Sequence, residues 1–389
     1  MLTLNPLFAL KKKTEHICLC VLELPTEEHQ LLIRKLWGEV GGSSCIMKLP
    51  KNDFSVNFDR HLASSDSQIH VDSRSILDHY RSKKSKAIFL QSPYPEHYPS
   101  WFASLQSDVS FAYAGYGINL SNYFEGQFNT PLIQLCRYLL AASPYELGGY
   151  QKYLEQDSTV LFSGNPLMYE LRRAIHNETR DQAQFKPQLL WAPHWSKDWI
   201  NGTQGFAQWR RTIGVVLDFA NSNPMIEIVV RPHPILREAI LASLFENRKT
   251  TNRESLKTID LNLDLDQLND FAKLLNLPNV TMSGNTMLED VLWASHLLTD
   301  GVSIIGYWAT TGKPMLVIQS QGGSPFNEDG KLIVSSTDSA VTVEEICLWL
   351  NQANFKSPTP TNVDLQALSR NIHPTFSKSP VQIFYESMH

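Results

Sequence analysis

The chain has 389 residues, of which 42% are apolar and 19% are charged, and its formal net charge at pH 7 is −5. A chain of this length usually divides into two domains of about 150–200 residues each. The composition excludes collagen-like, low-complexity and wholly disordered chains. The mild negative charge argues against a protein that neutralises nucleic-acid phosphates, so we expect no nucleic-acid partner.

Cysteine usage and the N-terminal segment bear on the compartment. The five cysteines are irregularly spaced and form no C-x-x-C pair, so neither a disulfide framework nor a zinc site is predicted. The N-terminal segment has its apolar residues before Lys11-Lys12-Lys13, the reverse of a secretory signal. No stretch approaches about 18 uninterrupted apolar residues. We expect a cytoplasmic protein with at most peripheral contact at the inner face of the membrane, and the sequence leaves its oligomeric state open.

The first half of the chain alternates between segments with strand patterns and segments with helix patterns. We expect strands at residues 16–24, 87–91, 110–113 and 158–162. We expect helices at residues 27–37, 131–142 and 166–175, the last with Pro166 in its first turn. The polar stretch at residues 177–187 is typical of a linker.

The second half alternates more regularly. The patterns predict strands at residues 188–192, 226–230, 279–282, 296–300 and 314–318. They predict helices at residues 206–221, 235–247, 287–295, 302–310 and 343–351, with residues 249–266 as an insertion or mobile loop. Strands that alternate with helices indicate βαβ units and parallel sheets. We therefore predict an α/β protein with domains 1–180 and 187–370 facing a cleft, and a tail, 371–389, that returns to the first domain.

Ligands of open parallel sheets bind at the carboxyl ends of the strands, which directs attention to Arg231-Pro-His-Pro234. The two prolines fix the backbone around His233, whose imidazole can donate to a phosphate oxygen or transfer a proton near neutral pH. Arg231 can form a bidentate pair with phosphate. The alternative is a histidine whose hydrogen bonds are satisfied by the backbone of a rigid turn.

Asp300-Gly-Val-Ser303 follows another predicted strand and resembles the entrance of a helix. Asp300 or Ser303 could cap the first free amides, or the amides from Gly301 onward and the Ser303 hydroxyl could hold a phosphate. A carboxylate repels phosphate, so Asp300 would orient a neighbour or contact a hydroxyl. Lys313, in Thr311-Gly-Lys-Pro314, could reach the same anion or could be a surface lysine.

Three further residues are weaker candidates. His194 ends the neighbouring strand in Ala192-Pro-His194, so two histidines could face one cleft. Glu96 and His97 lie in a proline-rich loop of the first domain, where either could be the base that deprotonates an acceptor hydroxyl, or could be solvent-exposed.

Several well-known motifs are absent from the sequence. It has no G-x-x-x-x-G-K-[ST], no G-x-G-x-x-G after the first strand, no G-x-S-x-G and no H-E-x-x-H. These absences weigh against P-loop enzymes, dinucleotide-dependent dehydrogenases, serine hydrolases and zinc proteases.

An ordered set of short motifs resembles the CDP-glycerol glycerophosphotransferase family, the teichoic-acid and capsule polymerase-like transferases. The set runs along the chain as Tyr116-Gly117, Ser163-Gly164-Asn165-Pro166, Ala192-Pro-His194, Arg231-Pro-His-Pro234, Thr299-Asp-Gly-Val-Ser303 and Thr311-Gly-Lys-Pro314. The resemblance implies a GT-B fold of two Rossmann-like domains. It also implies that His233 and Ser303, with Asp300 nearby, meet the phosphates of the donor.

The resemblance has two departures, both in the first domain. The family's Trp-His-Gly stretch, which supplies a catalytic histidine, has no match, and Tyr113-Ala-Gly-Tyr-Gly117 stands in its place. The family's Gly-Tyr-Pro stretch appears as Gly164-Asn-Pro166 without the basic residue or aspartate that follow it. Tyr116, Gly117, Gly164 and Asn165 are therefore expected to line the acceptor side or the cleft.

These observations favour a transferase of bacterial surface-polysaccharide assembly. It would move a glycosyl or glycerophosphate group from a cytidine-activated donor, CDP-glycerol or a CMP-sugar such as CMP-Kdo, to a glycan or lipid-linked acceptor. The expectation requires no metal and no cofactor besides the donor. The alternatives are a non-catalytic glycan- or nucleotide-binding protein and a nucleotide-sugar epimerase on the same scaffold.

Overall fold

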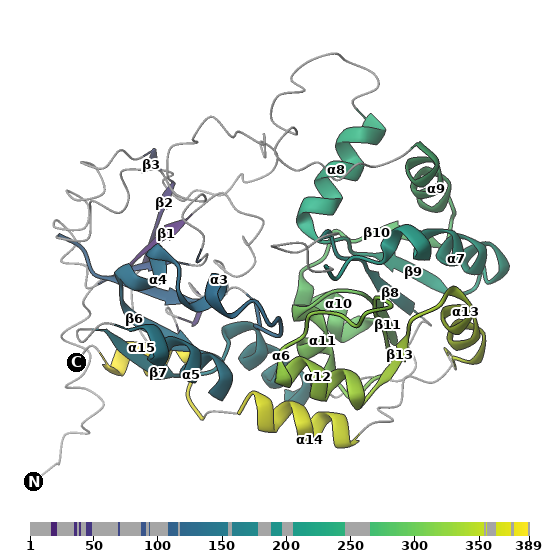
Figure 1. Cartoon of the computed structure of the whole chain (residues 1–389). Coiled ribbons are helices and arrows are strands. Elements are labelled where there is room, and N and C mark those ends of the chain that lie inside the picture. The colour runs from purple at the N-terminus through teal and green to yellow at the C-terminus, as the bar shows by residue number, and fades with distance from the viewer. Residues whose placement is uncertain are drawn as a thin grey trace, which may run out of the picture. The chain divides into compact units, whose positions relative to one another are not determined.

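The structure is a computed structural model of the whole chain (Figure 1). It describes residues 17–21, 35–36, 39, 44–48, 69–70, 87–90, 93, 108–115, 117–154, 158–177, 188–196, 205–245, 265–353, 355, 363–374 and 377–387. The predicted helix at 27–37 and the predicted loop at 249–266 fall largely outside these residues. The chain divides into two compact units: unit 1 comprises Met1–Gly117, Phe124–Tyr169 and His373–His389, and unit 2 comprises Ile118–Tyr123 and Glu170–Ile372.

Unit 1 contains a parallel sheet of seven described strands in the order β3-β2-β1-β4-β5-β6-β7. The strands are β1 (Ile17–Val21), β2 (Ser44–Lys48), β3 (Ile69–His70), β4 (Ile88–Leu90), β5 (Phe111–Ala114), β6 (Cys136–Ala141) and β7 (Thr159–Phe162). Counted from β1, this is the order of a Rossmann-like sheet, in which the chain moves outward from the centre first to one side and then to the other.

Helices cover both faces of this sheet. One face packs against α3 (Phe124–Phe128), α4 (Pro131–Leu135) and α5 (Pro144–Tyr153), around an apolar core that includes Phe111 and Phe128. On the other face lies α15 (Pro380–Ser387), whose Phe384 ring is 5.1 Å from that of Phe89 and 5.4 Å from that of Tyr138. Helix α6 (Pro166–Asn177) follows β7.

The predicted helix at 131–142 is wrong over its second half. Helix α4 ends at Leu135, and β6 begins at the next residue and pairs in parallel with both β5 and β7. Thr130 caps α4, since its side chain accepts from the Ile133 amide, but nothing in the sequence marks a stop. The apolar residues up to Ala142 fit both the helical period of about 3.6 residues and the strand period of two. The backbone groups of a central strand are satisfied by two neighbours, and this decides in favour of the strand.

Unit 2 contains a parallel sheet of six described strands in the order β10-β9-β8-β11-β12-β13. The strands are β8 (Gln188–Ala192), β9 (Glu227–Val230), β10 (Val280–Met282), β11 (His296–Thr299), β12 (Met315–Ile318) and β13 (Asp338–Ala340). Read from β8, this is again the doubly wound order. The chain reverses direction across the sheet between β8 and β11, which places the expected ligand site at their carboxyl ends.

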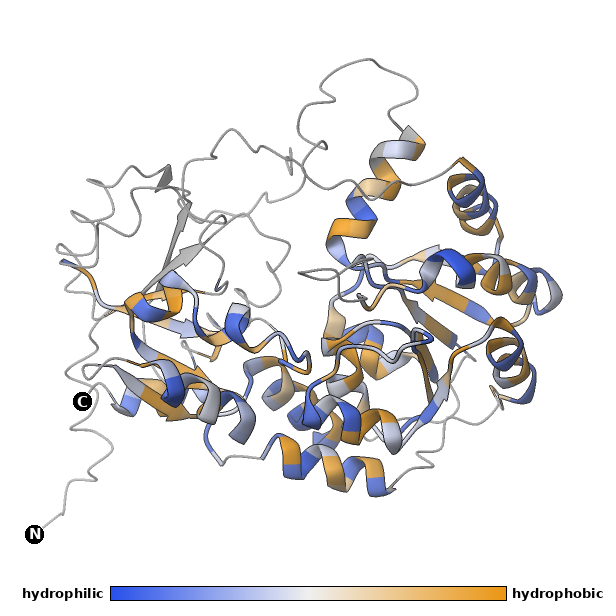
Figure 2. Cartoon of the chain, in the orientation of Figure 1, coloured by the Kyte–Doolittle hydropathy of each residue, from blue (hydrophilic) through white to orange (hydrophobic). Residues whose placement is uncertain are grey.

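The helices of unit 2 form two layers. One layer consists of α7 (Trp209–Ser222), α8 (Pro234–Phe245), α9 (Leu265–Leu275) and α13 (Val343–Gln352), which share a core with the sheet. The other consists of α10 (Met287–Trp293), α11 (Ser303–Ala309), α12 (Glu328–Ser335) and α14 (Val363–Ile372). Figure 2 shows hydrophobic strands between helices striped with polar residues, the pattern expected of a sheet covered on both faces.

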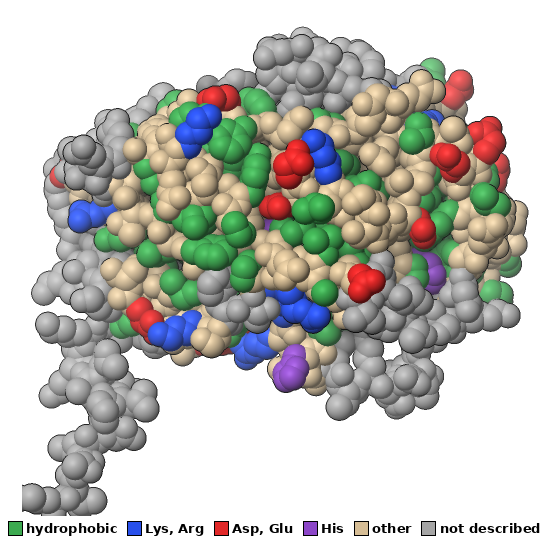
Figure 3. Space-filling model, turned by 60° about the horizontal axis from the view of Figure 1, so that its bottom comes forward, with side chains coloured by type: hydrophobic (Ala, Val, Ile, Leu, Met, Phe, Trp, Pro, Cys, Tyr) green, Lys and Arg blue, Asp and Glu red, His purple; other side chains and the backbone are tan. Residues whose placement is uncertain are grey.

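The surface carries both signs of charge. On the face shown in Figure 3, acidic and basic side chains of the described residues are interspersed among apolar ones. None of the described helices is both long and apolar enough to span a bilayer.

The aromatic core of unit 1 allows a test with two adjacent glycines of α5. A Cβ atom at Gly149 would lie 2.6 Å from the Phe128 ring, whereas one at Gly148 would meet nothing within 4 Å. Tyr150, 5.1 Å from the Phe128 ring centre, holds that ring in place. We expect Gly149→Ala to cost about 1–3 kcal/mol of unfolding free energy, and Gly148→Ala to be neutral or to stabilise by up to about 1 kcal/mol. Equal effects of the two variants in thermal unfolding would contradict this packing.

Candidate functional site

The candidate site is built at the carboxyl edge of the unit 2 sheet, around the end of β8. The pairing of β8 with β9 continues past both strands: the Arg231 amide donates to the Trp191 carbonyl at 2.8 Å, and the His233 amide to the Pro193 carbonyl at 2.9 Å. This extended register carries His233 to the side of His194. The structure thus brings the two predicted histidines together.

The two imidazoles are in direct contact. Their ring centres are 5.0 Å apart at an interplanar angle of 64°, an edge-to-face arrangement. Nδ1 of His194 accepts from the Ser196 amide at 3.3 Å and lies 2.8 Å from the Ser196 hydroxyl. Nδ1 of His233 accepts from the Ile235 amide at 3.3 Å, which caps the start of α8.

These contacts fix the protonation of both rings. A backbone amide can only donate, so each Nδ1 must carry a lone pair and the proton of the neutral ring must be on Nε2. Burial lowers the pKa of His194 to about 3. Burial, and then the neighbouring His194, lower the pKa of His233 well below its usual value. Both rings are therefore neutral at physiological pH, and each can offer an Nε2–H donor to an anionic group.

Asp300 connects the segments that follow β8 and β11. One carboxylate oxygen accepts from the His194 amide at 2.6 Å and the other from the Gln208 amide, the residue that precedes α7. The side chain is buried, and burial raises its pKa to about 7 although these amides lower it. Both oxygens are engaged by the backbone, so Asp300 holds the loop of His194 in place. Orienting a neighbour is one of the two roles expected of Asp300 from the sequence, and this geometry agrees with it.

In the turn after Asp300, the Gly301 amide and the Ser303 hydroxyl both donate to other groups of the protein. Thr299 Oγ1 donates to the Ala192 carbonyl at 2.6 Å and accepts from the Gly301 amide at 2.8 Å, so it ties β11 to β8. The Ser303 hydroxyl donates to the Ile118 carbonyl at 2.9 Å. The predicted phosphate contacts of the Gly301 amide and the Ser303 hydroxyl disagree with these bonds. A phosphate would have to displace both internal acceptors.

Arg231 pairs with a buried carboxylate. Its Nη1 lies 2.8 Å from Asp290 Oδ2 and also donates to the Asn285 carbonyl and the Ser283 hydroxyl. Asp290 is 2% exposed, and an unpaired charge there would be costly. The predicted bidentate phosphate contact of Arg231 is therefore not what this geometry supports.

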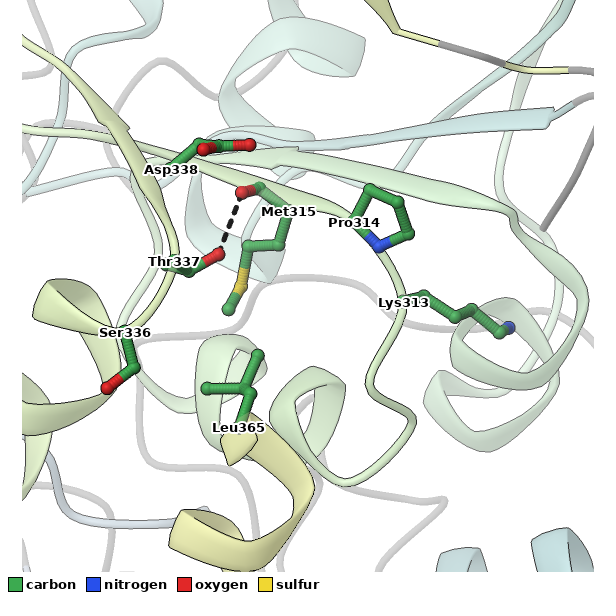
Figure 4. Close-up of a pocket in the computed structure, with 7 residues that line it drawn as sticks. All are labelled: Lys313, Pro314, Met315, Ser336, Thr337, Asp338 and Leu365. Carbon is green, nitrogen blue, oxygen red and sulfur yellow. Dashed lines mark hydrogen bonds between the residues drawn. The ribbon is translucent and has the colours of Figure 1, made fainter. Parts of the chain in front are cut away.

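Lys313 lies at the opposite, amino-terminal edge of the sheet, and its contacts are not those expected of a phosphate ligand. Its ammonium group donates to the carbonyls of Val291, Leu292 and Ala294 at 2.9, 2.6 and 2.7 Å, which satisfies the end of α10. A cavity of about 350 Å³ adjoins Lys313 at the amino ends of β12 and β13, but the Lys313 side chain points away from Met315 and Leu365 in its wall (Figure 4). This cavity is remote from the histidine pair.

The residues predicted in unit 1 are only partly described. Glu96, His97 and Tyr116 lie outside the described residues, so their roles stay predictions. Asn165 is buried and caps α6, since its Oδ1 accepts from the Met168 amide at 3.0 Å, and its Nδ2 donates to the Gly115 carbonyl. Gly164 adopts φ +82°, which favours glycine at this turn. Asn165 therefore joins the loop after β7 to the loop that contains Gly117.

Three residues that shape the site were missed by the sequence analysis. Ser196 fixes the His194 ring, Thr299 ties the strand ends together, and Asp290 pairs with Arg231. Thr299 is the first residue of a quoted motif and Ser196 lies two residues after another, so the turn chemistry of small hydroxyl residues could have indicated both roles. Nothing local indicates Asp290, because its partner is 59 residues away in the sequence.

Comparison with known proteins identifies the fold. No known family profile matches the sequence, and neither does any curated protein. Among solved structures, the wall teichoic acid polymerase TagF matches 97% of this chain and 89% of its own with 12% identity and a TM-score of 0.59. The UDP-GlcNAc 2-epimerase from Neisseria meningitidis, bound to UDP-GlcNAc, matches 96% and 99% with 12% identity and a TM-score of 0.54. The chain therefore has the GT-B class of fold, with two Rossmann-like α/β units, as predicted.

The role of Lys313 can be tested by removing its ammonium group. Lys313→Met leaves three carbonyls at the C-terminal end of α10, including that of the cap residue Ala294, without this donor, so we expect a loss of about 3 kcal/mol in unfolding free energy. Lys331→Met, whose side chain is 61% exposed, should change it by less than about 0.5 kcal/mol. Nucleotide binding should be unaffected in both. A Lys313→Met protein with normal stability and weakened nucleotide binding would restore the phosphate role.

Proposed function

We propose that this protein is a transferase of bacterial surface-polysaccharide assembly that uses a nucleotide-activated donor, most favourably a cytidine nucleotide. The single observation that carries the proposal is the neutral pair His194 and His233, held edge to face where the strand order reverses. The structural likeness supports it, since TagF is a polymerase of wall teichoic acid and a TagF variant soaked with CDPG matches 97% of this chain with a TM-score of 0.58.

In the proposed reaction, negative charge develops on the phosphate of CMP as CMP leaves. With a glycerophosphate donor, the acceptor hydroxyl attacks phosphorus in line, a P–O bond to the acceptor forms, and the bond to CMP breaks. With a CMP-sugar, the hydroxyl attacks the anomeric carbon, a C–O bond to the acceptor forms, and the C–O bond between that carbon and the phosphate of CMP breaks. In both cases the Nε2–H groups of His194 and His233 would donate to the departing phosphate, a preorganised stabilisation that needs no further cofactor.

The low pKa values of the two imidazoles serve this role. Burying a neutral imidazole costs less free energy than burying an imidazolium cation. The neutral ring also has no paired anion that a phosphate would have to displace. An anion placed beside the rings favours their charged form, so donor binding would raise both pKa values. Glu96 and His97 remain the predicted bases for the proton of the acceptor hydroxyl.

A second candidate is a nucleotide-sugar epimerase, favoured by the likeness to the epimerase bound to UDP-GlcNAc. The two enzymes differ in a simple way, because an epimerase turns over its nucleotide sugar without an acceptor. A binding protein would bind the nucleotide with no turnover at all.

The proposal is tested by His233→Asn, combined with nucleotide binding. Asn keeps an acceptor for the Ile235 amide but lacks the Nε2–H donor, so folding should be retained. In the wild type, CMP or CDP should raise the unfolding temperature more than UDP or GDP, since a ligand of the native state stabilises it by mass action. The variant should lose this response and about 10²- to 10³-fold in kcat.

The matched control is His176→Asn, which makes the same change on the exposed end of α6. It should behave as wild type in both assays. A response of the wild type to UDP or GDP but not to cytidine nucleotides would overturn the proposed donor. Full activity of His233→Asn would overturn the proposed role of the histidine pair.

A further inference from the structure

One short segment of the chain belongs to unit 2, although the residues on both sides of it in the sequence belong to unit 1. Residues Ile118–Tyr123, here called the strap, lie between β5 and α3 of unit 1 but belong to unit 2. Ser121 forms an antiparallel bridge with Phe326, and the Asn122 amide donates to the Pro325 carbonyl at 2.9 Å. Leu120 is fully buried. The strap is therefore an integral part of unit 2.

Asn327 is the main attachment point of the strap. Its backbone amide donates to the Leu120 carbonyl at 2.9 Å, and its side-chain Nδ2 donates to the Asn119 carbonyl at 2.9 Å. Its Oδ1 accepts from the Gly330 amide at 2.8 Å and so caps α12. The two ends of one amide group thus hold two different structures, the strap and the helix.

The strap also packs on α11, directly after the Asp300 turn. The Ser303 hydroxyl donates to the Ile118 carbonyl, so the serine expected to bind phosphate binds the strap. A Cβ atom at Gly306 would lie 3.1 Å from Ile118 Cδ1 and 3.2 Å from Leu120 Cδ1. A larger residue at this position would press the strap away from the helix.

A continuous series of ring contacts leads from the strap to the histidine pair. The Phe326 ring is 5.0 Å from that of Phe206, and the Phe206 ring is 5.7 Å from that of His194. Phe206 and Phe326 are both fully or almost fully buried. The Phe206 amide also donates to the Ser196 hydroxyl, which lies 2.8 Å from His194 Nδ1. A shift of Phe326 would therefore displace Phe206. Phe206 contacts His194 directly through its ring and indirectly through the Ser196 hydroxyl.

We propose that Asn327 is a positioning residue of the candidate site. By holding the strap against Phe326, it keeps Phe206 packed on His194 and so sets the orientation of that imidazole. The consequence for donor binding rests on the proposed function, whereas the positioning of the ring does not. Packed side chains with two available arrangements can carry coupling of this kind between sites.

The test uses Asn327→Asp, which separates the two tasks of the side chain. Aspartate still accepts from the Gly330 amide and caps α12 as well as asparagine does. It has no Nδ2–H, and its second oxygen would repel the Asn119 carbonyl, so this end of the strap shifts while the backbone contacts of the strap remain. Asn221→Asp is the matched control, because it removes an amide donor and adds the same charge at an exposed site on α7.

The readout is the NMR spectrum of protein labelled with ¹³C at histidine Cε1, recorded without nucleotide. We expect Asn327→Asp to move the His194 resonance beyond its linewidth and Asn221→Asp to leave it in place. Gly306→Ala, which presses on the strap and leaves the α12 cap intact, should move the same resonance. An unmoved His194 resonance in folded Asn327→Asp and Gly306→Ala would overturn the proposal.

A second readout separates this proposal from the proposed function. If His194 binds the donor, Asn327→Asp should weaken binding of CDP about 2- to 30-fold, the range for coupling carried through packed side chains. If His194 moves in the spectrum but neither wild type nor variant binds any nucleotide, the positioning role stands and the proposed function fails.

Discussion

The Asp300 carboxylate is the constraint on which the candidate site depends. It follows β11, and its two oxygens accept from the amides of His194 after β8 and of Gln208 before α7. A carboxyl group buried among backbone donors is a rigid connector, because each of its oxygens is satisfied by a fixed partner. With His194 fixed in this way, the β8–β9 register brings His233 beside it. The neutral donor pair is thus a consequence of strand order and one buried side chain.

Much of the fold could be predicted because α/β units have a strong local signal. Short apolar strands bounded by Gly, Pro and polar turns indicated β8, β9, β11 and β12 closely. One failure lies at residues 131–142, where the apolar run fits both a helical and a strand period, and β2 and α5 were not predicted at all. Sheet pairing on both sides of β6, a non-local interaction, decided the outcome. The edge strand β13 was also missed, because only one of its three residues, Ala340, is apolar.

The positions of the two histidines were predictable from the sequence, whereas the internal partners of the other site residues were not. His194 and His233 follow strands directly, and parallel strands end at the same edge, so their proximity follows from the topology. Arg231, Ser303 and Lys313 were expected at phosphate because their residue types suit it, yet each has an internal partner. Those partners, Asp290, Ile118 and the carbonyls that end α10, come from other elements. The motifs therefore predicted the location of the site correctly, but they did not predict the contacts of each side chain.

Side-chain nitrogen NMR can show whether His194 and His233 are neutral rings protonated at Nε2, as their contacts require. A long-range ¹H–¹⁵N spectrum of ¹⁵N-histidine protein can be recorded near pH 5, where an unperturbed imidazole with a pKa of about 6.5 is cationic. The asparagine variants at each position assign the signals. Both rings should still be neutral at this pH, with the proton on Nε2. Imidazolium signals, or a proton on Nδ1 of either ring, would contradict this prediction.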